Sequence, residues 1–543
     1  MSAVLQVLAS ANGPQLAKLR ALEEAYYRDF LALWSRLGAG ERAPEVAISG
    51  AAPVQTDVWS LPFFEYLRQL HALNSRYLLQ VGELAQLDPP AARRLKFLLR
   101  QLADAMSPNN FAATNPEVIK LAAQTGGESI ARGLKLLAGD IARGRISMTD
   151  EAAFALGRNL AVTPGAVIFE NEVMQLIQYA PATPQVHANP LLIVPPFINK
   201  YYILDLQPEN SFVRFCVEQG FSTFMVSWRN IPADLGDLGW EDYIEQGVLA
   251  PLKVVKAISG ADKINTLGFC VGGTLLACAL AVLAARKQTP VASLSLLATL
   301  LDYSETGEIS IYIDREFVER IEHEFSAPGV MSGAKLAHAF ASLRANDLIW
   351  HFVINNYLKG RSPPAFDLLY WNADSCNVPG RLYAYYVRNM YLENSLRIPG
   401  KLNASGVPLD LGAIGVPAYI LATRDDHIVP WQSAYASVGL LGGDAQFVLG
   451  ASGHVAGIVN PATANRRHHW LNPVAAEDAE NWFAGASRQS GSWWNHWAEW
   501  LRQRSGERKP APERLGNRQH PVIEAAPGRY VKDKSDYEQL VEE

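Results

Sequence analysis

One cysteine stands between glycines in the segment Gly268–Gly273 (Gly-Phe-Cys-Val-Gly-Gly). An apolar, strand-like run precedes this segment, and the apolar run Thr274–Ala285, which reads as a buried helix, follows it. A strand, a sharp turn and a helix in this order present a nucleophile at the helix N-terminus, where free N–H groups and the helix dipole stabilise a thiolate. We therefore expect Cys270 to be a nucleophile, and the alternative is a buried structural cysteine beside packing glycines.

An acid and a histidine follow later in the chain, each directly after another strand-like run. Asp425 and Asp426 compete for the position of the acid, and we favour Asp426. His454 follows the last apolar run of the series, with His427 as a second candidate. The order nucleophile, acid, histidine is the chain order of a hydrolase-type triad, so the pattern predicts Cys270, Asp426 and His454 as one catalytic group.

A site of this kind also needs two N–H donors for the oxyanion that forms during acyl transfer. One donor is expected from the residue after the nucleophile, here Val271. The second should come from the loop after an earlier strand, here Pro195-Pro196-Phe197-Ile198. Because proline has no N–H, Phe197 or Ile198 must serve, and we favour Ile198.

The elements that must position these groups follow from apolar runs that alternate with helical segments. Such alternation predicts a mostly parallel sheet flanked by helices, and with the cysteine turn it predicts the α/β-hydrolase fold. The expected strands are residues 191–194, 223–228, 264–267, 293–298, 418–422 and 446–449. The segment between the fourth and fifth strands is too long for a simple crossover. We therefore expect an inserted cap at about residues 305–400, which is rich in tryptophan and tyrosine.

The N-terminal part is predicted to be helical. Leu19, Leu22, Tyr26 and Phe30 belong to a stripe with helical spacing, which we interpret as packing surface, with a binding face for a partner or a lipid-like granule as the alternative. Asn115-Pro116 has the form of a helix start. We predict a helical domain at residues 1–155 and a catalytic domain at residues 156–543.

Composition excludes several classes of protein. Hydrophobic residues make up 49% and charged residues 19% of the 543, which is typical of a globular chain. The net charge of −6 gives no reason to expect a nucleic-acid partner. The four cysteines have no zinc-like spacing, so we expect neither a metal site nor a disulfide framework. We find no signal peptide and no run long enough to span a bilayer, and therefore expect a cytoplasmic protein.

Several motifs together resemble the polyhydroxyalkanoate synthases, and they do so in order and spacing from about Asn115 to the C-terminus. The first hundred residues match only loosely. The motifs are Pro195–Leu206, Val226–Asn230, Gly268–Thr274, Asp426–Trp431, Gly450–His454, Gly491–Trp494 and Pro527–Val531. One small departure is Arg424-Asp425-Asp426, where the family commonly has Arg-Glu-Asp.

This resemblance implies a class I enzyme, which acts without a second kind of subunit. The implied substrates are (R)-3-hydroxyacyl-CoA thioesters, chiefly 3-hydroxybutyryl-CoA, and the implied product is a polyester stored in cytoplasmic granules. It implies no cofactor beyond the CoA of the substrate, and a homodimer in equilibrium with the monomer. The family's nucleophile, acid and base fall on Cys270, Asp426 and His454, and Arg344 is implied to meet the CoA phosphates.

Two other functions fit the same residues. A cysteine-type hydrolase of esters or thioesters would share the whole triad, so the triad alone does not exclude it. A granule-coating protein without enzymatic activity would use the amphipathic N-terminal helix instead.

Overall fold

The computed structural model describes residues 13–39 and 57–535 of the chain. Contacts divide these residues into two compact units. The first is a helical unit, formed by the chain up to Asp150 together with the inserted segment His338–Pro364. The second is a larger α/β unit, formed by Glu151–Ala337 and the described chain from Ala365 onward.

The helical unit contains a long helix pair at its start. Tyr26 of α2 (Gly13–Ala39) donates a hydrogen bond to Asn74 of α3 (Pro62–Glu83) at 2.8 Å, and Leu33 is buried. Every residue of the predicted α2 stripe is buried or half-buried, which agrees with its interpretation as packing surface. The helices are α2 (Gly13–Ala39), α3 (Pro62–Glu83), α4 (Pro89–Ala105), α5 (Pro116–Gln124) and α6 (Glu128–Arg143). As predicted, the Asn115 side chain accepts from the first N–H groups of α5.

The inserted segment 338–364 fastens to this unit through polar side chains. Tyr357 donates to Asp140 Oδ2 at 2.7 Å, and Asn356 donates to the Ser147 carbonyl at 2.7 Å. Lys359 forms an ion pair with Glu117 at 2.5 Å. The sequence-based interpretation placed this segment within one continuous cap at 305–400, whereas its contacts group it with the N-terminal helices. The domain boundaries proposed above otherwise remain a prediction.

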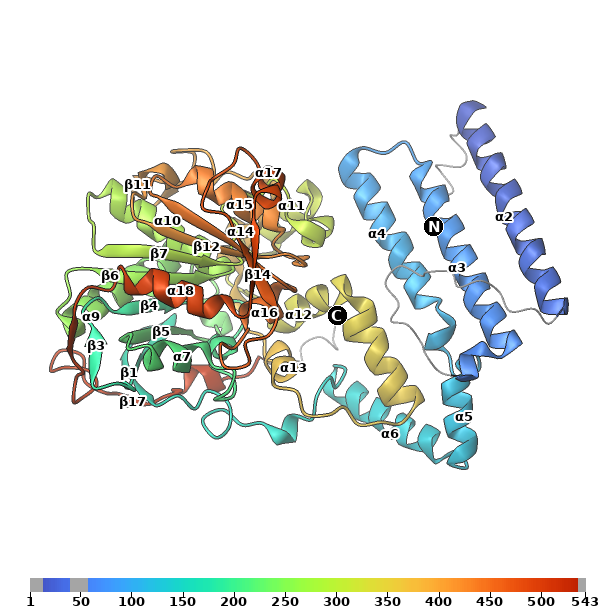
Figure 1. Cartoon of the computed structure of the whole chain (residues 1–543), viewed down its shortest axis with the longest axis horizontal. Coiled ribbons are helices and arrows are strands. Elements are labelled where there is room, and N and C mark those ends of the chain that lie inside the picture. The colour runs from blue at the N-terminus through green and yellow to red at the C-terminus, as the bar shows by residue number, and fades with distance from the viewer. Residues whose placement is uncertain (1–12, 40–56, 536–543) are drawn as a thin grey trace. The chain divides into compact units, whose positions relative to one another are not determined.

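The α/β unit is built on an eleven-stranded sheet in the order β15-β14-β13-β12-β7-β6-β4-β5-β2-β1-β17 (Figure 1). Its six central strands run parallel to one another. They are β4 (Leu191–Val194), β5 (Thr223–Trp228), β6 (Ile264–Phe269), β7 (Val291–Leu297), β12 (Ala418–Thr423) and β13 (Ala445–Gly450). These are the six strands that the sequence predicted, and their buried, apolar residues explain why they could be recognised.

Antiparallel strands extend the sheet at both edges. On one side are β2 (Met174–Tyr179), β1 (Gly165–Glu170) and β17 (Glu524–Ala525). On the other side are β14 (His468–Leu471) and β15 (Ser487–Ser490). Two further strands therefore pair beyond β13, the strand that precedes His454.

Helices cover both faces of the sheet and enclose two apolar cores. On one face lies α10 (Val271–Ala285), in which every residue from Val271 to Leu283 is buried. The other face receives α7 (Phe212–Glu218) and α18 (Trp493–Arg502). The four tryptophans of α18 are buried, and Trp493, Trp494 and Trp497 pack against Phe212. Trp497 also donates to Ser295 of β7 at 3.0 Å. The tryptophan-rich C-terminal region is therefore core.

The tail after Arg504 is extended and anchored to the α/β unit. Strand β16 (Arg508–Pro510) pairs with β3 (Gln185–His187), and β17 pairs with β1. Tyr530 and Val531 are buried, and the ammonium of buried Lys200 donates to the carbonyls of Tyr530 and Asp533. In the described parts of the chain, no helix has both the length and the apolar character needed to cross a bilayer.

Candidate active site

Cys270 occupies the sharp turn between β6 and α10. Its backbone has φ +52° and ψ −130°, a conformation that a non-glycine residue adopts only where surrounding contacts hold it. Two hydrogen bonds do so: the Cys270 N–H donates to the Leu297 carbonyl at 2.9 Å, and Thr299 Oγ1 donates to the Cys270 carbonyl at 3.2 Å. The half-buried thiol therefore lies at the carboxyl end of β6 and at the first turn of α10.

The glycines around Cys270 are explained by close backbone contacts. A Cβ on Gly268 would lie 2.3 Å from the Gly273 Cα, and a Cβ on Gly272 would lie 2.3 Å from the Pro195 carbonyl oxygen. Neither distance is compatible with any side chain. Gly272 thus lets the loop after β4 approach the start of α10 directly, as the predicted oxyanion site requires.

Asp426 and His454 come from the carboxyl ends of β12 and β13 and meet in a buried ion pair. His454 Nδ1 lies 2.7 Å from Asp426 Oδ2, while Asp426 Oδ1 accepts from the N–H groups of Ile428 and Val429 at 2.9 Å each. The imidazole also stacks on Phe269 at 5.5 Å between ring centroids. The carboxylate therefore fixes both the orientation and the tautomer of the imidazole.

The protonation states of this pair follow from burial and from the two charges around the imidazole. Burial alone would lower the pKa of His454, but the negative charges of Asp426 and of a Cys270 thiolate raise it well above its usual value. Burial would raise the pKa of Asp426, yet His454 and the two backbone N–H donors lower it. Since His454 also hydrogen-bonds to Cys270, the imidazole can take a proton from the Cys270 side while Asp426 stabilises the charge that forms.

The competing candidates lie elsewhere. Asp425 is exposed, and its N–H donates to the Ser452 carbonyl at 3.0 Å. His427 is half-buried, and its carbonyl accepts from the N–H of Glu308 at 3.2 Å. Asp426, and not Asp425, is the acid that bonds to His454.

Val271 and Ile198, the two residues predicted to form the oxyanion hole, lie at the start of α10 and in the loop after β4. Val271 is the first residue of α10, so its N–H has no intrahelical carbonyl to bond. Ile198 follows β4, is half-buried, and accepts from the Cys376 N–H at 3.1 Å through its carbonyl. The Phe197 side chain is buried among the rings of Trp228 and Tyr243. Their assignment as oxyanion donors remains a prediction.

Arg344 belongs to the helical unit and not to the unit that carries Cys270. Its guanidinium is about half exposed and pairs with Asp347, three residues further along. An exposed pair of this kind is weak, so the guanidinium can exchange partners. Contact with CoA phosphates remains a prediction for this residue.

Tyr303, Tyr386 and Tyr391 pack together near the start of α10: the Tyr303 hydroxyl lies 3.0 Å from Oγ1 of Thr274, one turn after Cys270, and 3.3 Å from the Tyr386 hydroxyl, and the Tyr391 ring lies 5.1 Å from the Tyr303 ring. Tyr303 follows β7, and Tyr386 is the last residue of α14 (Gly380–Tyr386). Tyr391 lies in the π-helical turn Val387–Leu392. Tyr386 was noted in the sequence only as part of an aromatic insertion, and Tyr303 and Tyr391 were missed. Residues so far apart in the chain carry no common spacing signal, and only the fold brings them together.

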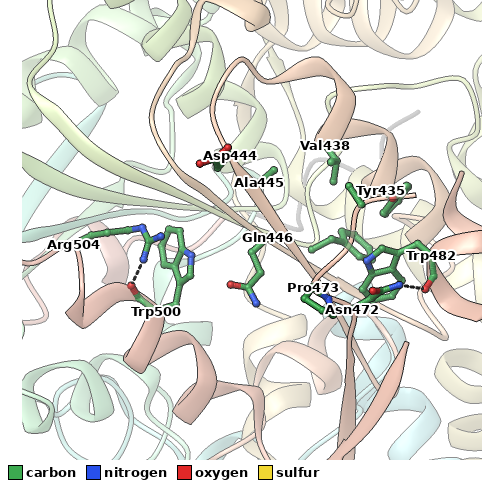
Figure 2. A pocket seen from close by; sticks show the side chains of 12 residues that line it. Tyr435, Val438, Asp444, Ala445, Gln446, Asn472, Pro473, Trp482, Trp500 and Arg504 are labelled. Atoms are coloured by element: carbon green, nitrogen blue, oxygen red, sulfur yellow. Dashed lines mark hydrogen bonds between the residues drawn. The ribbon is translucent and has the colours of Figure 1, made fainter. Parts of the chain in front are cut away.

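A separate cavity of about 280 Å³ opens at the other end of the sheet (Figure 2). It is lined by Asp444, Gln446, Trp482 and Arg504, among others. Asp444 and Gln446 lie at the start of β13, whereas His454 follows the end of that strand. This cavity is therefore distinct from the candidate active site. Within the described residues, no cluster of histidine, cysteine and acidic side chains could hold a metal ion.

Comparison with known proteins gives consistent matches along the chain. Residues 54–216 match a family described as poly-beta-hydroxybutyrate polymerase (PhaC) N-terminus, and residues 189–461 match the alpha/beta hydrolase fold. The predicted fold is thereby confirmed.

Three relatives are similar over most of their length. The poly(3-hydroxyalkanoate) polymerase subunit PhaC of Cupriavidus necator is 48% identical, over 96% of this chain and 89% of the relative. The corresponding subunit of Rhizobium meliloti is 40% identical over 87% of this chain and 77% of its own. The poly(3-hydroxyalkanoate) polymerase of Methylorubrum extorquens is 40% identical over 88% of this chain and 80% of its own length. With this extent of identity on either side of the Cys270 turn, the chain belongs to the poly(3-hydroxyalkanoate) polymerase family, whose members are acyltransferases.

Proposed function

We propose that this protein polymerises (R)-3-hydroxyacyl-CoA, chiefly 3-hydroxybutyryl-CoA, into a polyester with release of CoA, and that Cys270 carries the acyl chain. The observation that supports this most directly is the hydrogen-bonded series Cys270, His454 and Asp426 in a member of the polymerase family. We further propose that it acts as a class I enzyme, without a second kind of subunit.

The first half-reaction loads the cysteine. The Cys270 sulfur attacks the thioester carbonyl as its proton passes to His454, and Asp426 stabilises the imidazolium that forms. The N–H groups of Val271 and Ile198 would stabilise the oxyanion. The C–S bond to CoA then breaks, and CoA leaves with the proton from His454. Because one thioester replaces another, the acyl group remains activated on the enzyme.

The second half-reaction extends the chain. A chain-end hydroxyl attacks the Cys270 thioester, a C–O bond forms, the C–S bond breaks, and the hydroxyl proton returns to the sulfur through His454. In an alternative, Asp426 acts on the hydroxyl more directly. The carboxylate accepts two backbone N–H groups and the imidazole, and this full set of partners favours the orienting role for Asp426.

Four finer properties complete the proposal. Arg344 would bind the CoA phosphates, since an exposed guanidinium suits a phosphate group. The protein would exist as a homodimer in equilibrium with the monomer. It would work in the cytoplasm at the surface of polyester granules, and it would need no cofactor beyond the CoA of its substrate.

Purified protein supplied with 3-hydroxybutyryl-CoA tests the proposal. We expect CoA release together with insoluble polymer. Release of free 3-hydroxybutyrate without polymer would instead identify a thioester hydrolase and contradict the proposal. Cys278→Ala is a matched control, because Cys278 is buried in the same helix about two turns beyond Cys270 and should leave polymer formation intact.

A further inference from the structure

A cluster of basic side chains surrounds Trp470 on β14, and the mechanism above does not use it. The guanidinium carbon of Arg424 lies 5.1 Å from the centroid of the Trp470 ring and 4.5 Å from that of Phe483 on α17 (Ala479–Ala484). The His468 ring packs edge to face on Trp470, with 4.5 Å between the ring centroids. Because a cation is attracted to the face of an aromatic ring, two rings together hold the Arg424 guanidinium in place.

Arg488 joins this cluster from the neighbouring strand. It lies opposite Trp470 in the pairing of β14 with β15, so the two side chains share one face of the sheet, and His468, two residues before Trp470, shares that face. Arg488 Nη2 lies 3.0 Å from His468 Nδ1. A guanidinium can only donate, so Nδ1 accepts and the ring proton of His468 is on Nε2. Two guanidinium groups and one imidazole N–H therefore gather around a single indole ring.

The positive charge of the cluster is available to a ligand. The side chains of Arg424 and Arg488 are exposed, and within the described residues neither forms an ion pair with a carboxylate. Burial lowers the pKa of His468, the charges of Arg488 and Arg424 lower it further, and Asp425 opposes them. A neutral donor between two unpaired guanidinium groups suits a phosphate, whose oxygens accept several hydrogen bonds at once.

The cluster is attached to the loop that carries His454. The Arg424 N–H donates to the Gly450 carbonyl at 2.8 Å, and the Ala451 N–H donates to the His468 carbonyl at 3.1 Å. These hydrogen bonds join the carboxyl ends of β12 and β13 to the start of β14. The basic cluster therefore lies at the same end of the sheet as the catalytic group.

The distance across the sheet matches the length of the pantetheine arm of CoA. From β6, which leads to Cys270, the sheet continues through β7, β12 and β13 to β14, and these four strand intervals amount to roughly 19 Å. About thirteen bonds join the sulfur of CoA to its first phosphorus, which is roughly 15 Å in an extended chain. The long Arg424 side chain starts from β12, nearer to Cys270, so the phosphates lie within its reach.

We propose that Arg424, Arg488 and His468 bind a phosphate group of CoA while the thioester at the other end of the molecule is presented to Cys270. This proposal rests on the proposed function, which makes a CoA thioester the substrate. The three side chains belong to the unit that carries Cys270, whereas Arg344 does not. They form no bond to the reacting atoms and serve to bind and orient the substrate.

The test compares 3-hydroxybutyryl-CoA with 3-hydroxybutyryl-pantetheine, which has the same thioester and no phosphate. The ratio of kcat/KM for the two substrates, measured by thiol release, reports what the phosphates contribute. Arg424→Gln and Arg488→Gln should each lower this ratio about tenfold, mainly through KM of the CoA substrate, because a charge-assisted hydrogen bond is lost. Arg518→Gln is the matched control: it removes the same charge from the tail, where the adjacent Asn517 donates to α9 (Ala250–Ser259), and should leave the ratio unchanged.

Two further measurements identify the source of the phosphate. Arg424→Lys keeps the charge and should retain more of the ratio than Arg424→Gln. Inorganic pyrophosphate should compete with 3-hydroxybutyryl-CoA, and about tenfold more of it should be needed in Arg424→Gln. Pyrophosphate inhibition that depends on Arg424 while the substrate ratio stays constant would mean that the site takes free phosphates and not CoA, which would overturn the proposal.

Arg488→Gln carries the decisive result, because Arg488 is exposed on an edge strand and its replacement should not affect folding. An unchanged ratio in this variant, or an equal loss for both substrates, would overturn the proposal. Failure of the proposed function would be seen separately, as wild-type protein that releases no CoA or forms no polymer.

Discussion

Asp205 is a buried acid whose charge is expected to lower the stability of the folded protein. It follows the loop after β4 and is almost completely inaccessible. Oδ1 accepts from the hydroxyls of Thr163 and Ser211, each at 2.6 Å. Within the described residues, Oδ2 has no hydrogen-bond partner. Burial raises the pKa of Asp205 from 3.8 to about 6, although the two hydroxyl donors oppose this rise.

The sign and size of the effect follow from this pKa. Between pH 4 and pH 6 the folded protein keeps the proton that the unfolded chain has released, so rising pH favours unfolding. The difference of about two pH units corresponds to about 3 kcal/mol in the free energy of unfolding. The folded protein loses this stability as the pH rises from 4 to 6, and it recovers the stability when the pH falls back below 4. Asp205→Asn keeps an acceptor for Thr163 and Ser211 and removes the charge. We expect the variant to be more stable than the wild type by up to about 3 kcal/mol above pH 6, and by much less near pH 4.

Unfolding followed by tryptophan fluorescence between pH 4 and pH 8 measures this difference, because the tryptophans of α18 are buried in the same unit. Asp140→Asn provides a control of opposite sign in the helical unit, where unfolding is followed by the loss of helical circular dichroism. Burial would raise the pKa of Asp140, but hydrogen bonds from Ser147 and Tyr357 lower it. That substitution should destabilise at neutral pH and matter less in acid. If the advantage of Asp205→Asn is the same at pH 4 and pH 8, the reasoning is refuted.

Three further substitutions test other parts of the fold and site. Gly272→Ala places a Cβ 2.3 Å from the Pro195 carbonyl oxygen, so it should lower the free energy of unfolding by about 1–3 kcal/mol and abolish most polymerase activity. The control Gly439→Ala lies in open space on α15 (Trp431–Leu440) and should stabilise the protein. Equal melting temperatures for the two variants would show that the close backbone contact at Gly272 does not matter. Asp426→Asn should reduce kcat at least 10³-fold by removing the carboxylate that orients His454, measured as the rate of CoA release, and a loss below tenfold would argue against that role. Lys200→Met removes the buried ammonium that binds the carbonyls of Tyr530 and Asp533, so trypsin should cut at Arg529 and Lys532 faster than in the wild type. The control Lys509→Met removes a lysine from another part of the tail and should not speed this cleavage. Unchanged cleavage in Lys200→Met would mean that the other contacts are enough to hold the tail in place.

The central part of the fold could be predicted because its signals are local. The six parallel strands are short apolar runs, and the Cys270 turn is marked by glycines that only a tight backbone contact explains. The outermost strands, β15 and β17, were missed for an equally local reason. All four residues of β15 are exposed, and β17 has only two residues, so neither carries a burial pattern.

The site was predictable only where chain order determines geometry. Asp426 and His454 each follow a parallel strand, and the carboxyl ends of such strands meet at one edge of the sheet. The packed rings of Tyr303, Tyr386 and Tyr391 depend instead on side-chain directions in a loop and a π-helical turn, which no spacing rule gives. Segment 338–364 was likewise assigned by its position in the sequence, although polar contacts with Asp140 and Ser147 decide where it packs.

The central claim is that Cys270 carries the growing chain, and the mass of the peptide that contains it after brief mixing with 3-hydroxybutyryl-CoA tests this claim most directly. We predict 3-hydroxybutyryl units bound through a thioester at Cys270, and neither adduct nor polymer in Cys270→Ala. Cys270→Ser should be nearly inactive, because a serine alkoxide is much harder to form than a thiolate. Polymer synthesis by Cys270→Ala, or an adduct confined to another residue, would contradict the assignment.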